Sequence, residues 1–140
     1  MLAAEPEPGQ LRAGAHTDYG TLTILRSDDT RVAGGLQVRN RAGDWLDVRV
    51  PAGAFVVNIG DMLMRWTNDR WVSTLHRVVN PPSELRRASR RQSLVFFHNP
   101  NPDAIVECLP GCCGPDNPPR YSPITAGEFI AEKSRKAYGG

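Results

Sequence analysis

Apolar and polar residues alternate over short stretches of this chain, as expected for half-buried β-strands. Leu36 and Val38, for example, alternate with the polar Gln37 and Arg39. Thirteen glycines and twelve prolines divide most of the sequence into segments of strand length. The pattern predicts an all-β fold, either a sandwich or a jelly roll. We expect strands at residues 11–16, 21–26, 35–39, 45–50, 54–59, 73–80, 91–98 and 104–108.

The C-terminal end has a different pattern, which predicts a helix. Thr125 and Glu128 are spaced as in a capping box, and Ile124 and Phe129 are spaced as in a hydrophobic staple. We expect a helix over residues 126–137 that lies on the flank of the sheet, because it carries few apolar residues. The predicted organisation is therefore a flexible segment 1–10, a jelly-roll domain 11–124 and a C-terminal helix within 125–140.

Composition narrows the classes of function. The chain has 40% hydrophobic and 23% charged residues, which is ordinary for one soluble domain. Seventeen basic against fifteen acidic side chains give a net charge of +2, too balanced to indicate a nucleic-acid or membrane partner. The start of the chain is acidic and rich in proline, unlike a signal peptide, and the three cysteines suit a reducing compartment. We therefore expect a cytoplasmic protein.

The candidate chemistry begins where the first predicted strand ends. His16 and Asp18 are two residues apart, so on an extended strand their side chains share one face. A second strand can bring His76 to the same point. Two histidines and one carboxylate form the facial triad of non-heme Fe(II) oxygenases, which leaves coordination positions open. A single His-x-Asp also arises by chance, and a surface histidine paired with an acid is the alternative interpretation.

A second candidate pair opens the most apolar predicted strand. Arg91 and Ser93 lie two residues apart, directly before Leu94 and three further apolar residues. The guanidinium can hold both oxygens of a carboxylate, and the hydroxyl can add one hydrogen bond. We therefore expect a carboxylate receptor on a strand inside an apolar cavity, with a surface charge at Arg91 as the alternative.

Two further features favour structural roles. Asp61 follows a glycine, and we expect its side chain to cap a short segment over residues 62–66, with a role near His76 as the alternative. The thiols of Cys108, Cys112 and Cys113 together with His98 offer four zinc ligands, but their spacing differs from that of known zinc sites. Ordinary loop thiols are the favoured interpretation.

Four motifs, taken together, resemble one known family. They are Gly14–Thr23 around His-Thr-Asp, Asn58-Ile59-Gly60-Asp61 with Trp66-Thr67-Asn68, Ser73–Val78 around His76, and Arg91-Gln92-Ser93. Their order and spacing resemble those of the 2-oxoglutarate and Fe(II)-dependent oxygenases of the isopenicillin N synthase type, from about residue 11 to residue 121. The resemblance implies a double-stranded β-helix, in which two sheets of a jelly roll hold the metal. It implies His16, Asp18 and His76 as iron ligands, and Arg91 and Ser93 as the residues that bind the far carboxylate of 2-oxoglutarate.

The resemblance also implies an activity. It predicts a dioxygenase that uses Fe(II), O2 and 2-oxoglutarate to hydroxylate, desaturate or cyclise a small organic substrate, with release of succinate and CO2. Three alternatives stay open: an oxidase of the same family that needs no oxo acid, a cupin-like zinc or manganese protein, and a non-catalytic metal-binding barrel fragment.

Family members usually carry an N-terminal region before the His-x-Asp strand, whereas His16 stands close to the start of this chain. We therefore expect a catalytic domain without that region. Its open sheet edge would favour self-association or pairing with another chain.

Overall fold

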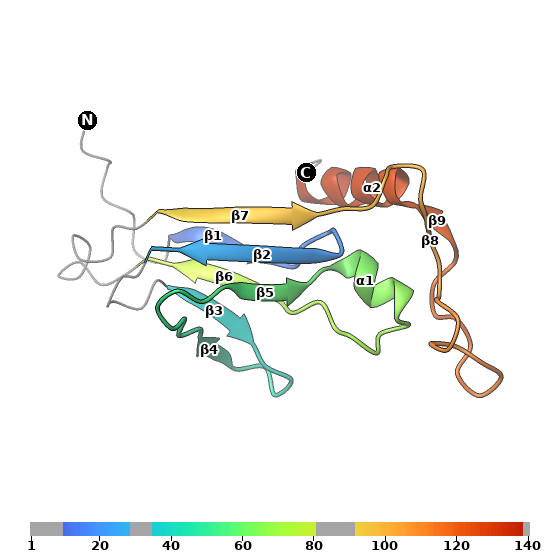
Figure 1. Ribbon diagram of the computed structural model, residues 1–140, viewed down its shortest axis with the longest axis horizontal. Helices are drawn as coiled ribbons and strands as arrows, with labels where there is room; N and C mark the ends of the chain where they lie inside the picture. The colour runs from blue at the N-terminus through green and yellow to red at the C-terminus, as the bar shows by residue number, and fades with distance from the viewer. Residues whose placement is uncertain (1–9, 29–34, 81–91, 139–140) are drawn as a thin grey trace. The chain divides into compact units, whose positions relative to one another are not determined.

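The computed structural model describes residues 10–28, 35–80 and 92–138 of the chain, so most of the predicted segment 1–10 lies outside the described residues. Strands predominate, and the last element is a helix, as the sequence predicts (Figure 1). The elements are β1 (Leu11–His16), β2 (Leu22–Ser27), β3 (Leu36–Arg39), β4 (Trp45–Asp47), β5 (Val56–Ile59), α1 (Asp61–Trp66), β6 (His76–Val79), β7 (Ser93–His98), β8 (Ile105–Val106), β9 (Ile124–Thr125) and α2 (Ala126–Tyr138).

The chain divides into two units, and the first contains a four-stranded antiparallel sheet in the order β1-β6-β3-β4. The register of β1 and β6 places His16 opposite His76. Two irregularities interrupt the β1 ladder before His16, so the end of this strand is not a regular continuation of its start. Strands β3 and β4 form a hairpin whose turn contains Gly43 at a φ of 95°, a conformation that favours glycine.

The second unit holds most of the three-stranded sheet β5-β2-β7, together with both helices and the short β8-β9 pair. Its core is formed by Met62 of α1, Val106 of β8, and Ala126 and Phe129 of α2. Helix α2 therefore contributes two core residues, although its thin apolar content predicts a position on the flank. The reason is that Phe129, the predicted staple partner of Ile124, lies in the first turn of the helix and faces the core. One aromatic ring there buries a large apolar area.

The predicted capping box of α2 is present. The Thr125 hydroxyl donates to a Glu128 carboxylate oxygen at 2.7 Å, and the Glu128 backbone N–H donates to the Thr125 hydroxyl at 3.2 Å. The Thr125 hydroxyl, and then the Thr125 backbone N–H, which also donates to the carboxylate at 3.2 Å, lower the pKa of Glu128 below its usual value. Within the described residues, no helix is both long and apolar enough to cross a bilayer.

Main-chain hydrogen bonds connect the start of α1 to the loop that follows Asp18. The Asp61 N–H donates to the Asp18 carbonyl at 2.8 Å, and the Gly60 N–H donates to the Thr21 carbonyl at 2.7 Å. A Cβ atom on Gly60 would collide with the carbonyl oxygen of Gly20. Glycine is therefore required at position 60 by lack of space, and α1 holds the loop through main-chain hydrogen bonds.

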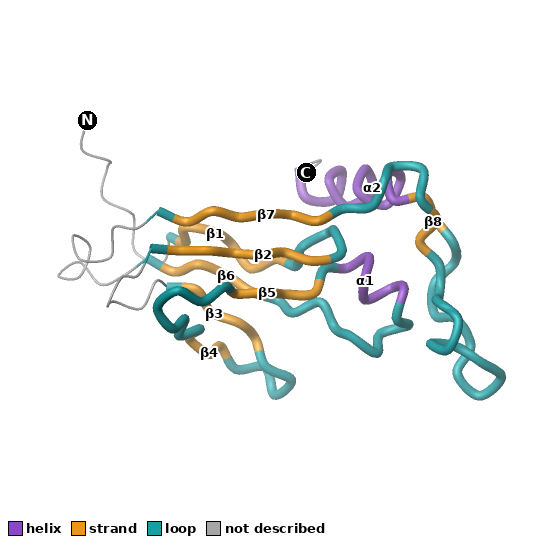
Figure 2. The backbone as a smooth tube through the Cα atoms, viewed as in Figure 1, coloured by secondary structure: helices purple, strands orange, loops and turns teal. Residues whose placement is uncertain are grey.

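Two features differ from the predicted strands. The strand expected over 73–80 begins only at His76, and the Ser73 N–H donates to the sulfur of Met64 and not to a sheet neighbour. Strand β7 is exposed along its whole length, with Leu94 67% and Phe96 60% accessible. The expectation that this strand lies inside an apolar cavity is therefore wrong for the described residues, since none of them covers it. The segment between β8 and β9 is a long loop, as its glycine and proline content predicts (Figure 2).

Candidate metal centre

Two histidines face each other on paired strands of the first unit. His16 is the last residue of β1, His76 is the first residue of β6, and their ring centroids are 4.3 Å apart. In each ring Nδ1 is hydrogen bonded to the carbonyl two residues earlier, Gly14 O at 2.7 Å and Thr74 O at 3.0 Å. A carbonyl oxygen can only accept, so Nδ1 carries the proton in both neutral rings and Nε2 carries the lone pair. The local chain thus sets the tautomer that a metal ligand needs.

The carboxylate of Asp18 is anchored by two strands of the second unit. Asp18 is 7% exposed, and its Oδ2 accepts from the Thr23 hydroxyl at 2.5 Å and from the Asn58 amide at 2.7 Å. Thr23 on β2 and Asn58 on β5 are partners in the antiparallel register, so both donors come from one rung of the sheet. Neither residue was predicted as a carboxylate partner. Both lie in motifs that carry the family resemblance, which is a signal that could have found them.

The structure brings all three predicted ligands together. His16, Asp18 and His76 each offer one ligand atom, and these atoms lie within 4.8 Å of one another. The chain itself keeps Asp18 near His16, since one residue separates them. Two imidazole nitrogens and one carboxylate oxygen fit Fe(II), because the set combines borderline and hard donors. Across residues 10–28, 35–80 and 92–138, this is the one group of three or more such side chains that could hold a metal.

The described residues do not support the zinc alternative. Cys108, Cys112 and Cys113 do not form a metal-ligand group with His98 within the described residues. His98 instead has its Nδ1 2.7 Å from the hydroxyl of Thr21. Desolvation, and then a hydrogen bond with Cys113, raise the pKa of Cys108 to about 11.

Of the two residues predicted to bind a carboxylate, Arg91 and Ser93, the structure describes only Ser93. Ser93 begins β7, and its hydroxyl lies 2.9 Å from the hydroxyl of Ser27 on β2. Next to it, the backbone N–H of Gln92 donates to the Asp28 carboxylate at 2.7 Å. Arg91 lies outside the described residues. The end of β7 that carries Ser93 is thus fixed by bonds to the end of β2.

Asp61 has a different role from the predicted cap. Helix α1 begins at Asp61 itself, Gly60 is the N-cap residue, and no side chain caps this end. The Asp61 carboxylate is instead buried, and its Oδ2 accepts from the Thr17 hydroxyl at 3.1 Å and from the ammonium of Lys133 at 2.6 Å. The prediction failed because Lys133 is distant in sequence, and a local pattern cannot reveal a long-range ion pair.

Comparison with known proteins agrees with this geometry. The profile of the 2OG-Fe(II) oxygenase superfamily matches residues 2–100, well over half of the chain. The chain belongs to this superfamily. Curated relatives include the 2-oxoglutarate-Fe(II) type oxidoreductase hxnY of Emericella nidulans, 42% identical over 127 residues, which cover 90% of this chain and 34% of the relative. Homoarginine-6-hydroxylase 2-ODD-233 of Oryza sativa subsp. japonica is 41% identical over 121 residues, covering 86% of this chain and 35% of the relative.

Solved structures support the same assignment. A full-length Neurospora crassa protein, solved in complex with alpha-KG, has a TM-score of 0.80 and 38% identity over 94% of this chain and 39% of that chain. A putative 2OG-Fe(II) oxygenase family protein from Caulobacter crescentus has a TM-score of 0.79 and 41% identity over 95% of this chain and 42% of that chain. These likenesses confirm the predicted all-β double-stranded β-helix with a C-terminal helix. The superfamily member described here spans about a third of the length of the curated relatives that it matches.

Proposed function

We propose that this oxygenase superfamily chain carries the iron and 2-oxoglutarate site of a dioxygenase. The activity would oxidise a small organic substrate, by hydroxylation, desaturation or ring closure, with release of succinate and CO2. The observation that carries the proposal is the grouping of His16, Asp18 and His76, whose ligand atoms lie within 4.8 Å of one another. Membership of the 2OG-Fe(II) oxygenase superfamily supports the choice of metal and cosubstrate.

The ligand residues have distinct tasks in this proposal. His16 and His76 would hold Fe(II) through Nε2, because their Nδ1 atoms are engaged with carbonyl groups. Asp18 would supply a carboxylate oxygen, and Thr23 and Asn58 would fix its orientation by binding Oδ2. When bound, the metal would supply the activation of O2 that no protein side chain can provide. The chain's own contribution is to hold three ligands on one side and to leave the other positions open.

The cosubstrate and substrate assignments go further than the ligand geometry. We assign the far carboxylate of 2-oxoglutarate to Arg91 and Ser93, as the motif resemblance implies, with the metal and cosubstrate site within residues 11–124. A small-molecule substrate fits the superfamily. Relatives and neighbours suggest two probes, since one relative is named a homoarginine-6-hydroxylase and one neighbour was solved with alpha-KG and thymine.

Location and partners are proposed on separate grounds. The cysteine count supports a cytoplasmic location. The nearly balanced charge supports the absence of nucleic-acid and membrane partners. The exposed apolar residues of β7 support self-association or pairing with another chain.

An anaerobic titration tests the metal and cosubstrate sites together. Fe(II) is added to the purified chain with and without 2-oxoglutarate, and the weak visible charge-transfer band of an iron-bound oxo acid is recorded. We expect about one Fe(II) per chain and a band that needs both components. His76→Ala is expected to abolish iron binding, because two ligands hold a divalent metal far more weakly than three.

The third histidine provides a matched control. His98→Ala removes an imidazole that lies outside the ligand group, so iron stoichiometry and the band should be retained. Arg91→Lys should weaken 2-oxoglutarate much more than iron, since an ammonium cannot reproduce the bidentate guanidinium contact. Unchanged iron stoichiometry in His76→Ala would remove His76 from the site. Iron binding without any band would contradict the assigned cosubstrate.

A further inference from the structure

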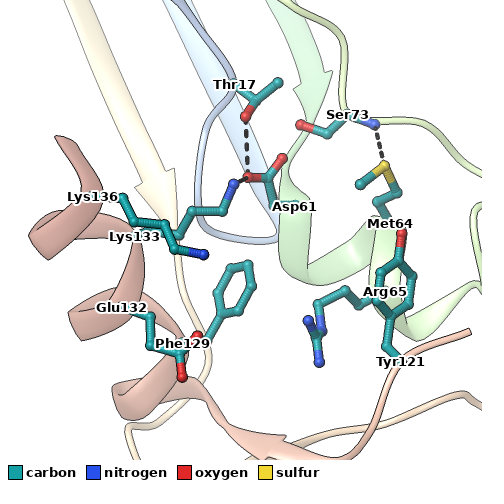
Figure 3. Close-up of a pocket in the computed structure, with 10 residues that line it drawn as sticks. All are labelled: Thr17, Asp61, Met64, Arg65, Ser73, Tyr121, Phe129, Glu132, Lys133 and Lys136. Carbon is teal, nitrogen blue, oxygen red and sulfur yellow. Dashed lines mark hydrogen bonds and ion pairs between the residues drawn. The ribbon is translucent and has the colours of Figure 1, made fainter.

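A cavity of about 310 Å³ lies within the second unit, beside the residue that separates the two ligands of the His-x-Asp motif. Thr17 and Asp61 form one wall, α2 forms another through Phe129 and two lysines, and Arg65 and Ser73 complete it (Figure 3). This volume is at the lower end of the range for small-molecule sites. The proposed dioxygenase chemistry leaves this cavity without a role.

The first sign of a ligand is a buried hydroxyl without a partner. Ser73 is 7% exposed, and its Oγ makes no hydrogen bond to any described residue. Its backbone N–H donates to the Met64 sulfur at 3.4 Å. Buried polar groups in native proteins are nearly always hydrogen bonded, and an exception indicates a missing ligand or water.

The second sign is a guanidinium held in place with one donor unmatched. Arg65 donates from Nη2 to the Ser122 carbonyl at 2.8 Å, and its Cζ lies 4.7 Å from the centroid of the Tyr121 ring. On the other side its Cζ lies 5.2 Å from the ring centroid of Phe129. The Arg65 Nε is buried and has no partner among the described residues. Two residues that line the cavity, Ser73 and Arg65, therefore each carry one buried polar atom without a partner among the described residues.

The charges around the cavity favour a single negative charge on the ligand. Asp61 is already engaged by Lys133 and Thr17, which leaves Lys136 as a second cation beside Arg65. Figure 3 shows the ammonium of Lys136 directed toward the space in front of the Phe129 ring. Counting all lining residues, the cavity has one cation more than it has acids. A carboxylate balances that charge, and a guanidinium is suited to its geometry.

We propose that this cavity binds a small monocarboxylic acid with an apolar body about the size of one aromatic ring. The carboxylate would accept a hydrogen bond from the Arg65 guanidinium, with Lys136 nearby as the second cation. The Ser73 hydroxyl lies beside Asp61 at the other end of the cavity (Figure 3) and would take up a water molecule or a polar group there. The apolar body would lie against Phe129 and Met64, which line the same space. The proposal stands on the second unit alone and does not depend on the iron site.

Benzoate is the probe, titrated calorimetrically into the full chain in excess EDTA, so that no metal-bound ligand contributes. Benzamide, which has the same shape without the charge, measures the electrostatic part. We expect millimolar or tighter binding of benzoate and at least tenfold weaker binding of benzamide. Arg65→Gln should weaken benzoate by about tenfold or more, and Lys136→Gln by a few-fold.

Two arginines serve as controls. Arg70→Gln changes an exposed arginine near the same helix, and Arg91→Gln changes the residue assigned to 2-oxoglutarate; each should bind benzoate within about twofold of the parent chain. If Arg65→Gln does not fold by circular dichroism, Lys136→Gln carries the test, and unchanged benzoate binding in that variant would overturn the proposal. The proposal is overturned if benzoate does not bind, if benzamide binds equally well, or if Arg91→Gln abolishes binding while Arg65→Gln retains it.

Discussion

The buried ion pair between Asp61 and Lys133 predicts an unusual asymmetry between its two single mutants. Asp61 is nearly inaccessible, with 3% of its side chain exposed, whereas 33% of the Lys133 side chain is exposed. Lys133→Met leaves a buried carboxylate with only the Thr17 hydroxyl and its backbone surroundings. Asp61→Asn leaves an ammonium that can turn into water. The lysine mutant should therefore be the less stable one.

The loss in unfolding free energy of each mutant depends on which charge remains buried. Removing one partner of a fully buried pair costs about 3–5 kcal/mol. Because Lys133 is one third exposed and solvent screens its interaction, we expect about 2–3 kcal/mol for Lys133→Met and about 1 kcal/mol for Asp61→Asn. The double mutant leaves no charge behind, so it should be more stable than Lys133→Met alone.

Urea unfolding followed by far-UV circular dichroism measures these differences. With a slope of about 2 kcal/mol per molar urea, the loss in Lys133→Met lowers the midpoint by about 1 M. Arg135→Met is the matched control, because it removes an exposed cation from the same helix and should change stability by less than about 0.5 kcal/mol. An Asp61→Asn mutant less stable than Lys133→Met, or a double mutant no better than Lys133→Met, would refute this reasoning.

Three further predictions concern single residues. Cys108, with its pKa raised to about 11 from 9.0, should react with iodoacetamide at pH 8 about a hundredfold more slowly than an ordinary thiol, as peptide mass spectrometry can show. Glu128 has a lowered pKa, so its stabilising contribution is present above pH 4.5 and is lost as the pH falls through the folded-state pKa; Glu128→Gln should flatten this part of a stability profile measured by thermal melting. Gly60→Ala should cost at least about 2 kcal/mol in urea unfolding, while Gly14→Ala, which meets nothing within 4 Å, should be nearly neutral; equal costs would contradict the packing argument.

The sequence was most informative where a local pattern is enough to define an element. The strand 11–16 and the capping box at Thr125 are local features, and both are present in the structure. The His-x-Asp pair was also predictable, because its two members lie two residues apart on the chain. His76 could be added through the motif resemblance, which carries information about long-range pairing that spacing alone does not.

Most of the features that were missed depend on contacts between distant segments. Asn58 lies 40 residues from Asp18 and binds its carboxylate through a sheet register with Thr23 that no local pattern determines. Lys133 reaches Asp61 from the other end of the chain, so the predicted helix cap was wrong. The exposure of β7 was missed for the opposite reason. Its apolar residues predict burial, and burial requires covering elements that the described residues do not supply.

The register that pairs His16 with His76 has a consequence for mechanical and thermal resistance. A metal held by both rings would close a loop of about 60 residues, as a covalent cross-link does. By the same chain-entropy relation, the lost conformational entropy would raise the free energy of the unfolded chain by about 4 kcal/mol. The strongest restraint would then act between the last residue of β1 and the first residue of β6. If the chain were pulled from its two ends, the force would act on the metal-ligand bonds of His16 and His76 before it reached most of the strands between them. The metal would thus act as a reversible cross-link between two strands as well as a catalyst. Removing it with a chelator would lower both the stability of the sheet and the activity.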